Sequence, residues 1–415
     1  MSGSPRRGLT VIVLATAVAG VAGYLVTWIV FRAVGAADYA VFAIFWSATY
    51  LLVGALSGIQ QEVTRATRHR DPEGPAVRPV ARNFALIAAL ITAVVVVAAT
   101  PLWVFVVFPH GGAGFVAPLA IGTAAYVVVA VTGGTLYGLS LWNPVALMVI
   151  LDGLLRLIAI GAVLLTTHDP VALAWAVALP FPISAAVVWL LVRSRVVGRN
   201  RLDVGPRALT WNVARTIAAA ASTGVLVSGF PVILKITSPG ENPQLLGVVI
   251  LAVTLVRAPL IVTAMSLQSY LIVQLRPEAG FARRVARLAG SIIAGGAAIS
   301  VLGWWLGPAL FLLLFGHLAV VAGWWIAVLV ASSVAVALLF VTGPALLVRG
   351  GHLTYSVGWL LAAAATVIAL LAPLPFLSRV VLALLVGPVV GLIAHALGLI
   401  SITYQRRRAQ DAAPE

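Results

Sequence analysis

Long apolar segments alternate with short polar ones along the entire chain. The unbroken apolar runs reach about 18 residues or more, the length typical of membrane spans. They lie near residues 9–31, 39–62, 84–108, 116–139, 144–166, 171–192, 208–234, 245–273, 288–315, 319–347, 353–371 and 380–402. Such runs cross a bilayer as α-helices, because a helix pairs every backbone amide within the segment. The pattern therefore predicts an all-α polytopic membrane protein with about twelve transmembrane helices.

The composition supports this interpretation. Of the 415 residues, 62% are hydrophobic and 9% are charged, whereas soluble domains average about 45–50% and about 25%. This excludes a soluble enzyme, because so few charges cannot cover so much apolar side chain. The absence of cysteine excludes disulfides, cysteine-ligated clusters and a cysteine nucleophile. The six histidines show no metal-ligand spacing, so neither a metal nor another cofactor is expected.

The formal net charge of +15 is distributed as a topology signal. Twenty Lys and Arg residues lie in connections on the side of the N-terminus, and only Arg32, Lys235 and Arg379 lie on the other side. The positive-inside rule then predicts two cytoplasmic termini, in a multi-pass protein of the bacterial cytoplasmic (inner) membrane. Basic residues of a nucleic-acid-binding protein gather on one face instead, so no nucleic-acid partner is expected.

The longest cytoplasmic connection divides the chain into two sets of six spans. The predicted domains are an N-terminal six-helix bundle (1–192), a cytoplasmic linker (193–207), a C-terminal six-helix bundle (208–402) and a cytoplasmic tail (403–415). Transporters commonly consist of such repeats, with the substrate site at their interface. A weak internal repeat agrees: Arg32 corresponds to Lys235 at an offset of 203, and Gln60 to Gln268 at an offset of 208.

The predicted outer connections are too short to fold into a catalytic domain. The longest, Lys235 to Gln244, has ten residues. Membrane glycosyltransferases and glycan polymerases usually carry a large outer loop with catalytic groups, so the protein is not expected to be an enzyme. Such an enzyme stays as a lesser alternative, as does a scaffold for envelope synthesis. No ATP-binding motif is present, so active transport would use an ion gradient, the membrane potential or a downhill substrate.

Arg257 lies about halfway along the eighth span, two residues before Pro259. A charge in hydrocarbon costs about 2.5–3.5 kcal/mol on insertion scales, so its presence needs a reason. One interpretation is structural: the proline frees a backbone carbonyl, which the arginine caps, or the arginine pairs with an acid elsewhere. The other is functional: the guanidinium faces a wet cavity and holds a phosphate through two hydrogen bonds.

Two further arginines lie inside predicted spans. Asp152 and Arg156 are spaced i, i+4 on the fifth span and therefore share a helix face. We favour a self-neutralising pair there over a role in a cavity. Arg215 lies two turns inside the seventh span. We favour a side chain that extends to the cytoplasmic surface over one that contacts the substrate.

Polar residues also mark the ends of the first, second and seventh predicted spans. The second span ends in Gln60, Glu62 and Arg65, where Glu62 is either a cytoplasmic helix cap or part of a gate between the two halves. Arg32 and Lys235 are either outer anchors or attract an anion at the outer mouth.

The charges inside the spans predict the class of cargo. The predicted spans contain three cations, Arg156, Arg215 and Arg257, but only one acid, Asp152, with Glu62 at the edge of its span. A cavity with a net positive charge suits an anionic cargo such as a lipid phosphate or pyrophosphate. The first span holds no acid, whereas a cation-coupled drug exporter would be expected to carry a carboxylate there. His395, in the twelfth span, is interpreted as hydrogen-bonded between helices, with a proton relay as the alternative.

The stretch Phe31 to Arg68, FRAVGAADYAVFAIFWSATYLLVGALSGIQQEVTRATR, resembles the opening of polysaccharide-transporter flippases. In that family a loop of the type xGxxxYGxFxx joins the first two spans. The matching residues here are Gly35, Asp38, Tyr39 and Phe42, and Ala40 replaces a glycine. The stretch Leu255 to Arg276, LVRAPLIVTAMSLQSYLIVQLR, resembles the eighth span of such proteins.

The resemblance implies the MATE-like fold of the multidrug/oligosaccharidyl-lipid/polysaccharide (MOP) superfamily, in which two six-helix bundles surround a central cavity that opens alternately inward and outward. It implies a flippase for undecaprenyl-pyrophosphate-linked oligosaccharides in envelope or exopolysaccharide synthesis. The implied partners are membrane lipids, this lipid-linked glycan, and glycosyltransferases or a polymerase of the pathway. Arg257 and Arg156 are the first candidates for its phosphate site, and Arg215, Arg32 and Lys235 the second. The alternative transport function is export of small amphipathic compounds, which would need cavity carboxylates.

Overall fold

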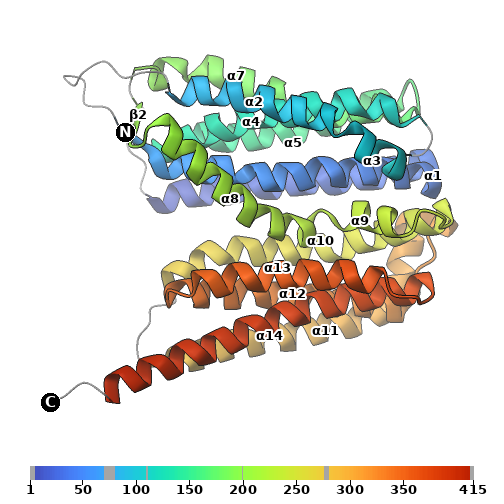
Figure 1. Ribbon diagram of the computed structural model, residues 1–415. Helices are drawn as coiled ribbons and strands as arrows, with labels where there is room; N and C mark the ends of the chain where they lie inside the picture. Colours follow the sequence, from blue (N-terminus) through green and yellow to red (C-terminus); the bar gives the residue numbers. More distant parts are fainter. Residues whose placement is uncertain (1–4, 70–79, 109–110, 199, 275–279, 412–415) are drawn as a thin grey trace. The chain divides into compact units, whose positions relative to one another are not determined.

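The computed structural model describes residues 5–69, 80–108, 111–198, 200–274 and 280–411, and this part of the chain is almost entirely helical (Figure 1). Two short strands pair antiparallel, with Arg68 opposite Arg201. The elements are α1 (Pro5–Ala66), β1 (Thr67–His69), α2 (Val80–Ala98), α3 (Thr100–Val107), η1 (Gly112–Phe115), α4 (Val116–Gly138), α5 (Trp142–Leu164), α6 (Pro170–Ala178), α7 (Pro180–Val196), β2 (Asn200–Leu202), α8 (Pro206–Val227), α9 (Phe230–Thr237), α10 (Pro243–Gln274), α11 (Phe281–Phe315), η2 (Gly316–Leu318), α12 (Gly323–Val348), α13 (His352–Leu370) and α14 (Phe376–Asp411).

The helices account for all twelve predicted spans. Ten helical segments of the described chain are long and apolar enough to cross a membrane, and the bent pair α8 and α9 makes an eleventh. One of the ten, Thr10–Ala66, is 57 residues long, whereas a bilayer needs about 20. It therefore contains the first and second predicted spans, which confirms the polytopic all-α prediction.

A single glycine reverses the chain within α1. Gly35 has φ 77° and ψ 177°, a backbone conformation that side chains with a Cβ rarely adopt. The rings of Phe31 and Tyr39, eight residues apart, lie in edge contact with centroids 5.1 Å apart. In a straight helix eight residues span about 12 Å, so the two spans turn back on each other at Gly35 without a loop.

Three of the predicted spans consist of two helices each. The breaks separate α2 from α3, α6 from α7, and α8 from α9. In each case the second helix has a proline in its first turn: Pro101, Pro180 or Pro231. Proline is tolerated there because an N–H in the first turn has no partner within its own helix, and the preceding helix cannot continue through a residue that has no N–H to donate. Hydropathy does not detect such breaks, because the sequence stays apolar across them.

The described chain forms two compact units, Met1–Gly224 and Val225–Glu415. In the first unit α1 packs against α4 and α5, and α2 packs against α4; in the second, α12 packs against α10, α11 and α14. Close approach of α4 to α1 requires Gly134, where an added Cβ would lie 2.8 Å from the Gln60 carbonyl oxygen. All of α8 up to Gly224 belongs to the first unit, and only its last three residues belong to the second, so this boundary lies beyond the linker 193–207. The division into bundles 1–192 and 208–402 stays a prediction.

Candidate functional site

Arg156 is held by Asp152 on the same face of α5. Its Nη1 and Nη2 donate to the two carboxylate oxygens of Asp152 at 2.7 and 2.8 Å. Its Nε donates to the carbonyl oxygen of Val177, at the end of α6, at 3.2 Å. Arg156 is only 3% exposed, so the guanidinium is satisfied along both edges within the first unit. This geometry agrees with the interpretation as a self-neutralising pair.

Aromatic rings surround the same guanidinium. The Arg156 Cζ lies 4.7 Å from the ring centroid of Phe181, 5.6 Å from that of Tyr50 and 5.8 Å from that of Trp46. Ring faces at these distances attract a cation, more strongly where water is excluded. The rings come from α1 and α7, so Arg156 ties three helices together. A direct role in cargo binding stays a prediction.

Arg257 presents the opposite situation in the second unit. It is 4% exposed, and its Nε is buried without a hydrogen-bond partner. Its guanidinium carbon lies over the ring of Phe230, at the start of α9, 5.9 Å from the ring centroid. Among the described residues no carboxylate lies within 4.0 Å of it, since the three ion pairs found there involve other arginines. A buried cation without a counter-ion is costly and marks a functional site by default.

Glu62 connects α1 to α8 within the first unit. This carboxylate is 4% exposed. It accepts from Arg65 Nε and Nη2 at 2.8 and 2.7 Å, and from Asn212 Nδ2 at 2.8 Å. One turn earlier the Thr216 hydroxyl donates to the Gly58 carbonyl at 3.0 Å. The predicted second and seventh spans are therefore joined at their predicted cytoplasmic ends, where a gate was one of the two interpretations.

The other candidate residues lie apart from these clusters. Arg215 is exposed on α8, and Lys235 is half-buried in the last turn of α9. Arg32 is exposed, with its guanidinium carbon 5.7 Å from the Trp28 ring centroid. Gln60 is half-buried against Gly133 of α4. The side chain of Gln268 lies outside the described residues.

His395 of α14 is bonded on both ring nitrogens. Its Nδ1 lies 2.8 Å from the Thr342 hydroxyl on α12, and its Nε2 lies 3.3 Å from the Tyr355 carbonyl on α13. The ring is fully buried, and Gly358 leaves room for it, since a Cβ there would lie 2.2 Å from His395 Cδ2. Three helices of the second unit thus meet at one imidazole, in agreement with the interpretation as a hydrogen bond between helices.

Replacing His395 with alanine is expected to lower the stability of the purified protein by about 2–4 kcal/mol, because two hydrogen bonds and a filled volume are lost. His395→Gln can restore one of the bonds and cannot relay protons at neutral pH. We expect it to keep most of the stability and all of the transport, measured by unfolding in detergent and in cells. A stable but inactive His395→Gln protein would support the relay instead.

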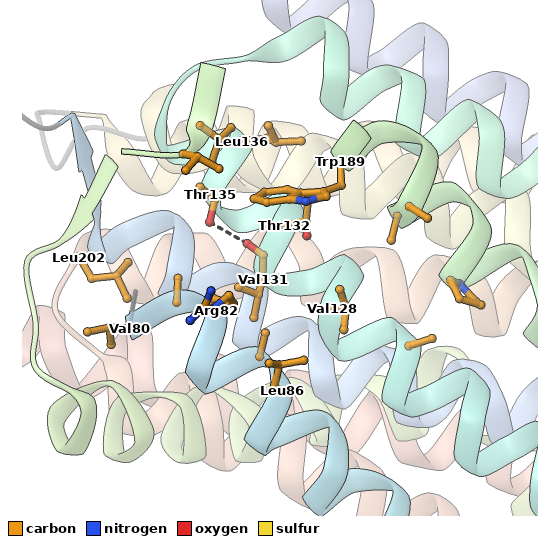
Figure 2. A pocket seen from close by; sticks show the side chains of 18 of the residues that line it. Val80, Arg82, Leu86, Val128, Val131, Thr132, Thr135, Leu136, Trp189 and Leu202 are labelled. Atoms are coloured by element: carbon orange, nitrogen blue, oxygen red, sulfur yellow. Dashed lines mark hydrogen bonds between the residues drawn. The ribbon is translucent and has the colours of Figure 1, made fainter. Parts of the chain in front are cut away.

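Sequence reasoning missed a groove on the first unit. A cavity of about 760 Å³ is lined by residues of α2, α4, α7 and the segment around β2 (Figure 2). The residues that line it are separated by long stretches of sequence, and only the packing of the helices brings them together. The two basic residues of its lining, Arg82 and Arg201, lie in polar connections, where the sequence alone indicates only topology.

Several solved structures of transporters have the same fold. An inward-facing multidrug resistance MATE family transporter of the MOP superfamily matches with a TM-score of 0.66 and 15% identity, covering 94% of this chain and 96% of that one. An outward-facing one matches at 0.61 and 17%, covering 98% and 97%. A MOP superfamily transporter from Pyrococcus furiosus, described as having a binding pocket of reverse polarity, matches at 0.57 and 17%, covering 97% of each chain. The chain thus has the fold of these MATE transporters.

Sequence relatives are found in mycobacteria. An uncharacterised protein of Mycobacterium bovis is 32% identical over 394 residues, and one of Mycobacterium tuberculosis is 33% identical over 396 residues. Each alignment covers 93% of this chain and 90% of the relative. The chain therefore belongs to the family of these mycobacterial proteins. No model of a known protein family matches the sequence.

Proposed function

We propose that this protein is a transporter that moves an anionic, amphipathic cargo across the membrane by alternating access. The observation that carries the proposal is Arg257, a buried guanidinium with no carboxylate partner among the described residues. Arg156 offers the contrast, because Asp152 neutralises it. Arg257 thus carries a positive charge that no carboxylate of the described chain balances, and an anionic group of the cargo would balance it.

The cargo class is a lipid-linked glycan, such as an undecaprenyl-pyrophosphate-linked oligosaccharide. A sugar-pyrophosphate headgroup cannot cross hydrocarbon without replacement of its water. A planar guanidinium supplies two parallel hydrogen bonds to a phosphate, together with the charge. The protein acts as a flippase in the bacterial cytoplasmic membrane, with both termini in the cytoplasm. It uses no cofactor and performs no catalysis; an ion gradient or the membrane potential drives it, and glycosyltransferases or a polymerase of the pathway are its partners.

A second candidate function is export of small amphipathic compounds. The observation that favours it is the fold itself, because two of the matched structures are described as multidrug resistance transporters. A cationic drug needs an available carboxylate, yet Asp152 is bonded to Arg156 and Glu62 to Arg65 and Asn212. The Pyrococcus furiosus protein, described by its reversed pocket polarity, supports the idea that pocket charge varies within this fold.

The test is the sidedness of lipid-linked glycans in cells depleted of the protein. We expect these intermediates to accumulate on the cytoplasmic leaflet. In depleted cells that express Arg257→Gln, export should be about 10- to 100-fold lower than in cells that express the wild-type protein. This is the range expected for the loss of hydrogen bonds to a charged group. Arg257→Lys should retain part of the activity, because it keeps the charge and loses the two-bonded geometry.

The matched control removes the other buried arginine together with its acid. The double variant Asp152→Asn, Arg156→Gln is expected to complement, because it deletes a pair that has no net charge; loss of export would instead support the predicted role of Arg156 in cargo binding. Membrane abundance of every variant is measured in parallel. Full complementation by Arg257→Gln would contradict the phosphate site. Normal glycan export with altered tolerance to amphipathic toxins would favour the exporter.

A further inference from the structure

The groove on the first unit has the shape of a site for a lipid chain. Along α4 its lining extends from Ala125 to Leu136. Eleven residues of helix rise about 16 Å, which matches half of a hydrocarbon core about 30 Å thick. The volume of about 760 Å³ lies in the range of ligand pockets. Leu86 and Trp189 on its rim are 61% and 40% exposed, so the groove opens on the outer surface of the helices.

One end of the groove is basic. Arg82, in the first turn of α2, and Arg201, in β2, are the charged residues among those lining it. Figure 2 shows the Arg82 side chain reaching into the pocket beside Val131. Arg82 makes one long hydrogen bond of 3.5 Å, to its neighbour Asn83. In the described chain neither arginine has a carboxylate within 4.0 Å, and Asp203, two residues after Arg201, pairs with Arg68 at 3.1 Å.

Thr132 provides a hydrogen-bond donor inside the groove. Helical threonines usually donate to the carbonyl four residues earlier. Thr135 does so, to Val131 at 2.9 Å, and Thr123 does so, to Leu119 at 2.7 Å. Thr132 is half-buried in the lining, and within the part of the chain that the structure describes its hydroxyl makes no hydrogen bond. A half-buried hydroxyl that makes no hydrogen bond within the described chain can donate to an acceptor of a molecule bound in the groove.

We propose that this groove binds an anionic phospholipid of the surrounding bilayer. The phosphate lies between Arg82 and Arg201, an ester carbonyl accepts from Thr132, and one acyl chain follows α4 toward Ala125. The basic end is where α2 begins and α7 ends, which the predicted topology places on the cytoplasmic side. Basic pockets between helices on that side suit anionic headgroups. The lipid is a resident of the first unit and is independent of the cargo proposed for Arg257.

The experiment uses the full-length protein, purified in detergent, with phosphatidylglycerol and phosphatidylcholine of identical chains as probes. Bound lipid is counted by native mass spectrometry, and the shift of the unfolding temperature is measured on addition of each lipid. We expect phosphatidylglycerol to bind more tightly and to stabilise more. The double variant Arg82→Gln, Arg201→Gln should weaken its binding roughly 30-fold, since each basic residue near an anionic surface contributes about fivefold.

A matched double variant separates the groove from general surface charge. Arg193 and Arg195 lie in the last turn of α7, at the same end, and do not line the cavity. Arg193→Gln with Arg195→Gln should leave phosphatidylglycerol binding within about twofold of wild type. Thr132→Val, which keeps the shape and removes the donor, should weaken binding of both lipids about threefold to tenfold.

Three results would overturn the proposal. They are equal binding of the two lipids, equal loss in the two double-arginine variants, and displacement of phosphatidylglycerol by a polyprenyl pyrophosphate at equimolar concentration. The last would assign the groove to the tail of the transported lipid. Both arginines are exposed, so the variants are expected to fold, and monodispersity in size-exclusion chromatography checks this. Failure here leaves the Arg257 result unaffected, because that experiment measures glycan sidedness in cells.

Discussion

Replacing Arg156 alone with alanine is expected to destabilise the first unit by about 3–5 kcal/mol. The cost arises because the carboxylate of Asp152 loses both of its hydrogen bonds and remains in the membrane without a counter-charge. The aromatic rings of Phe181, Tyr50 and Trp46 also lose the cation that they surround. The measurement is unfolding of the purified protein in detergent, followed by tryptophan fluorescence or by a thermal shift.

A double-mutant cycle shows whether the pair or the arginine itself matters. Adding Asp152→Asn to Arg156→Ala should recover more than half of the lost stability, since no buried charge is then left unpaired. The single variant Asp152→Asn, which strands the arginine instead, is expected to be as damaging as Arg156→Ala. If the double variant is as unstable as the single ones, the contribution of Arg156 lies in its packing and not in neutralisation.

Replacing Gly58 with valine is expected to separate α8 from the part of α1 that follows the turn at Gly35. An added Cβ would lie 2.6 Å from the backbone nitrogen of Ile217 and 2.6 Å from the backbone carbon of Thr216. Backbone atoms of a packed helix cannot move aside as a side chain can, so overpacking here should cost about 3 kcal/mol or more. The hydrogen bond from Asn212 to Glu62 should be lost as well.

Because the chain has no cysteine of its own, the separation of α8 from α1 can be measured by disulfide cross-linking of introduced cysteines. A Cβ on Gly54 would lie 3.6 Å from the Gly224 Cα, so cysteines at these two positions come within reach of a disulfide. We expect high cross-linking of Gly54→Cys with Gly224→Cys, and a reduction of at least fivefold when Gly58→Val is added. Gly23→Val is the matched control on α1, because a Cβ there meets nothing within 4 Å. Unchanged cross-linking with Gly58→Val would contradict the predicted separation.

The spans were predictable because hydropathy responds to the hydrocarbon core, which every span has to cross. The reversal at Gly35 was less visible, since the apolar runs 9–31 and 39–62 predict two spans but not that one residue joins them. The pairing of β1 with β2 could not be inferred, because the strands lie in polar connections more than 130 residues apart, with His69 opposite Asn200. Contacts of this kind depend on tertiary packing, which a single sequence does not encode locally.

Among the candidate residues too, contacts within one helix were predictable from the sequence, and contacts between helices were not. The i, i+4 spacing of Asp152 and Arg156 was sufficient to predict their pairing, because helix geometry is local. The isolation of Arg257 was not predictable, since it depends on which side chains the neighbouring helices present. The same holds for the contact of Glu62 with Asn212, 150 residues later in the sequence. Sequence reasoning identified the charged residues correctly, while their partners required the structure.

The turn at Gly35 has a consequence for biosynthesis. Because the first two spans meet without a loop, a translocon has to pass almost no polar backbone across the bilayer to form them. We expect the pair to insert as one helical hairpin, with Arg32 and Asp38, both exposed near the turn, as the charges that cross. A glycosylation acceptor or protease site placed at this turn would then remain too close to the membrane surface to be used.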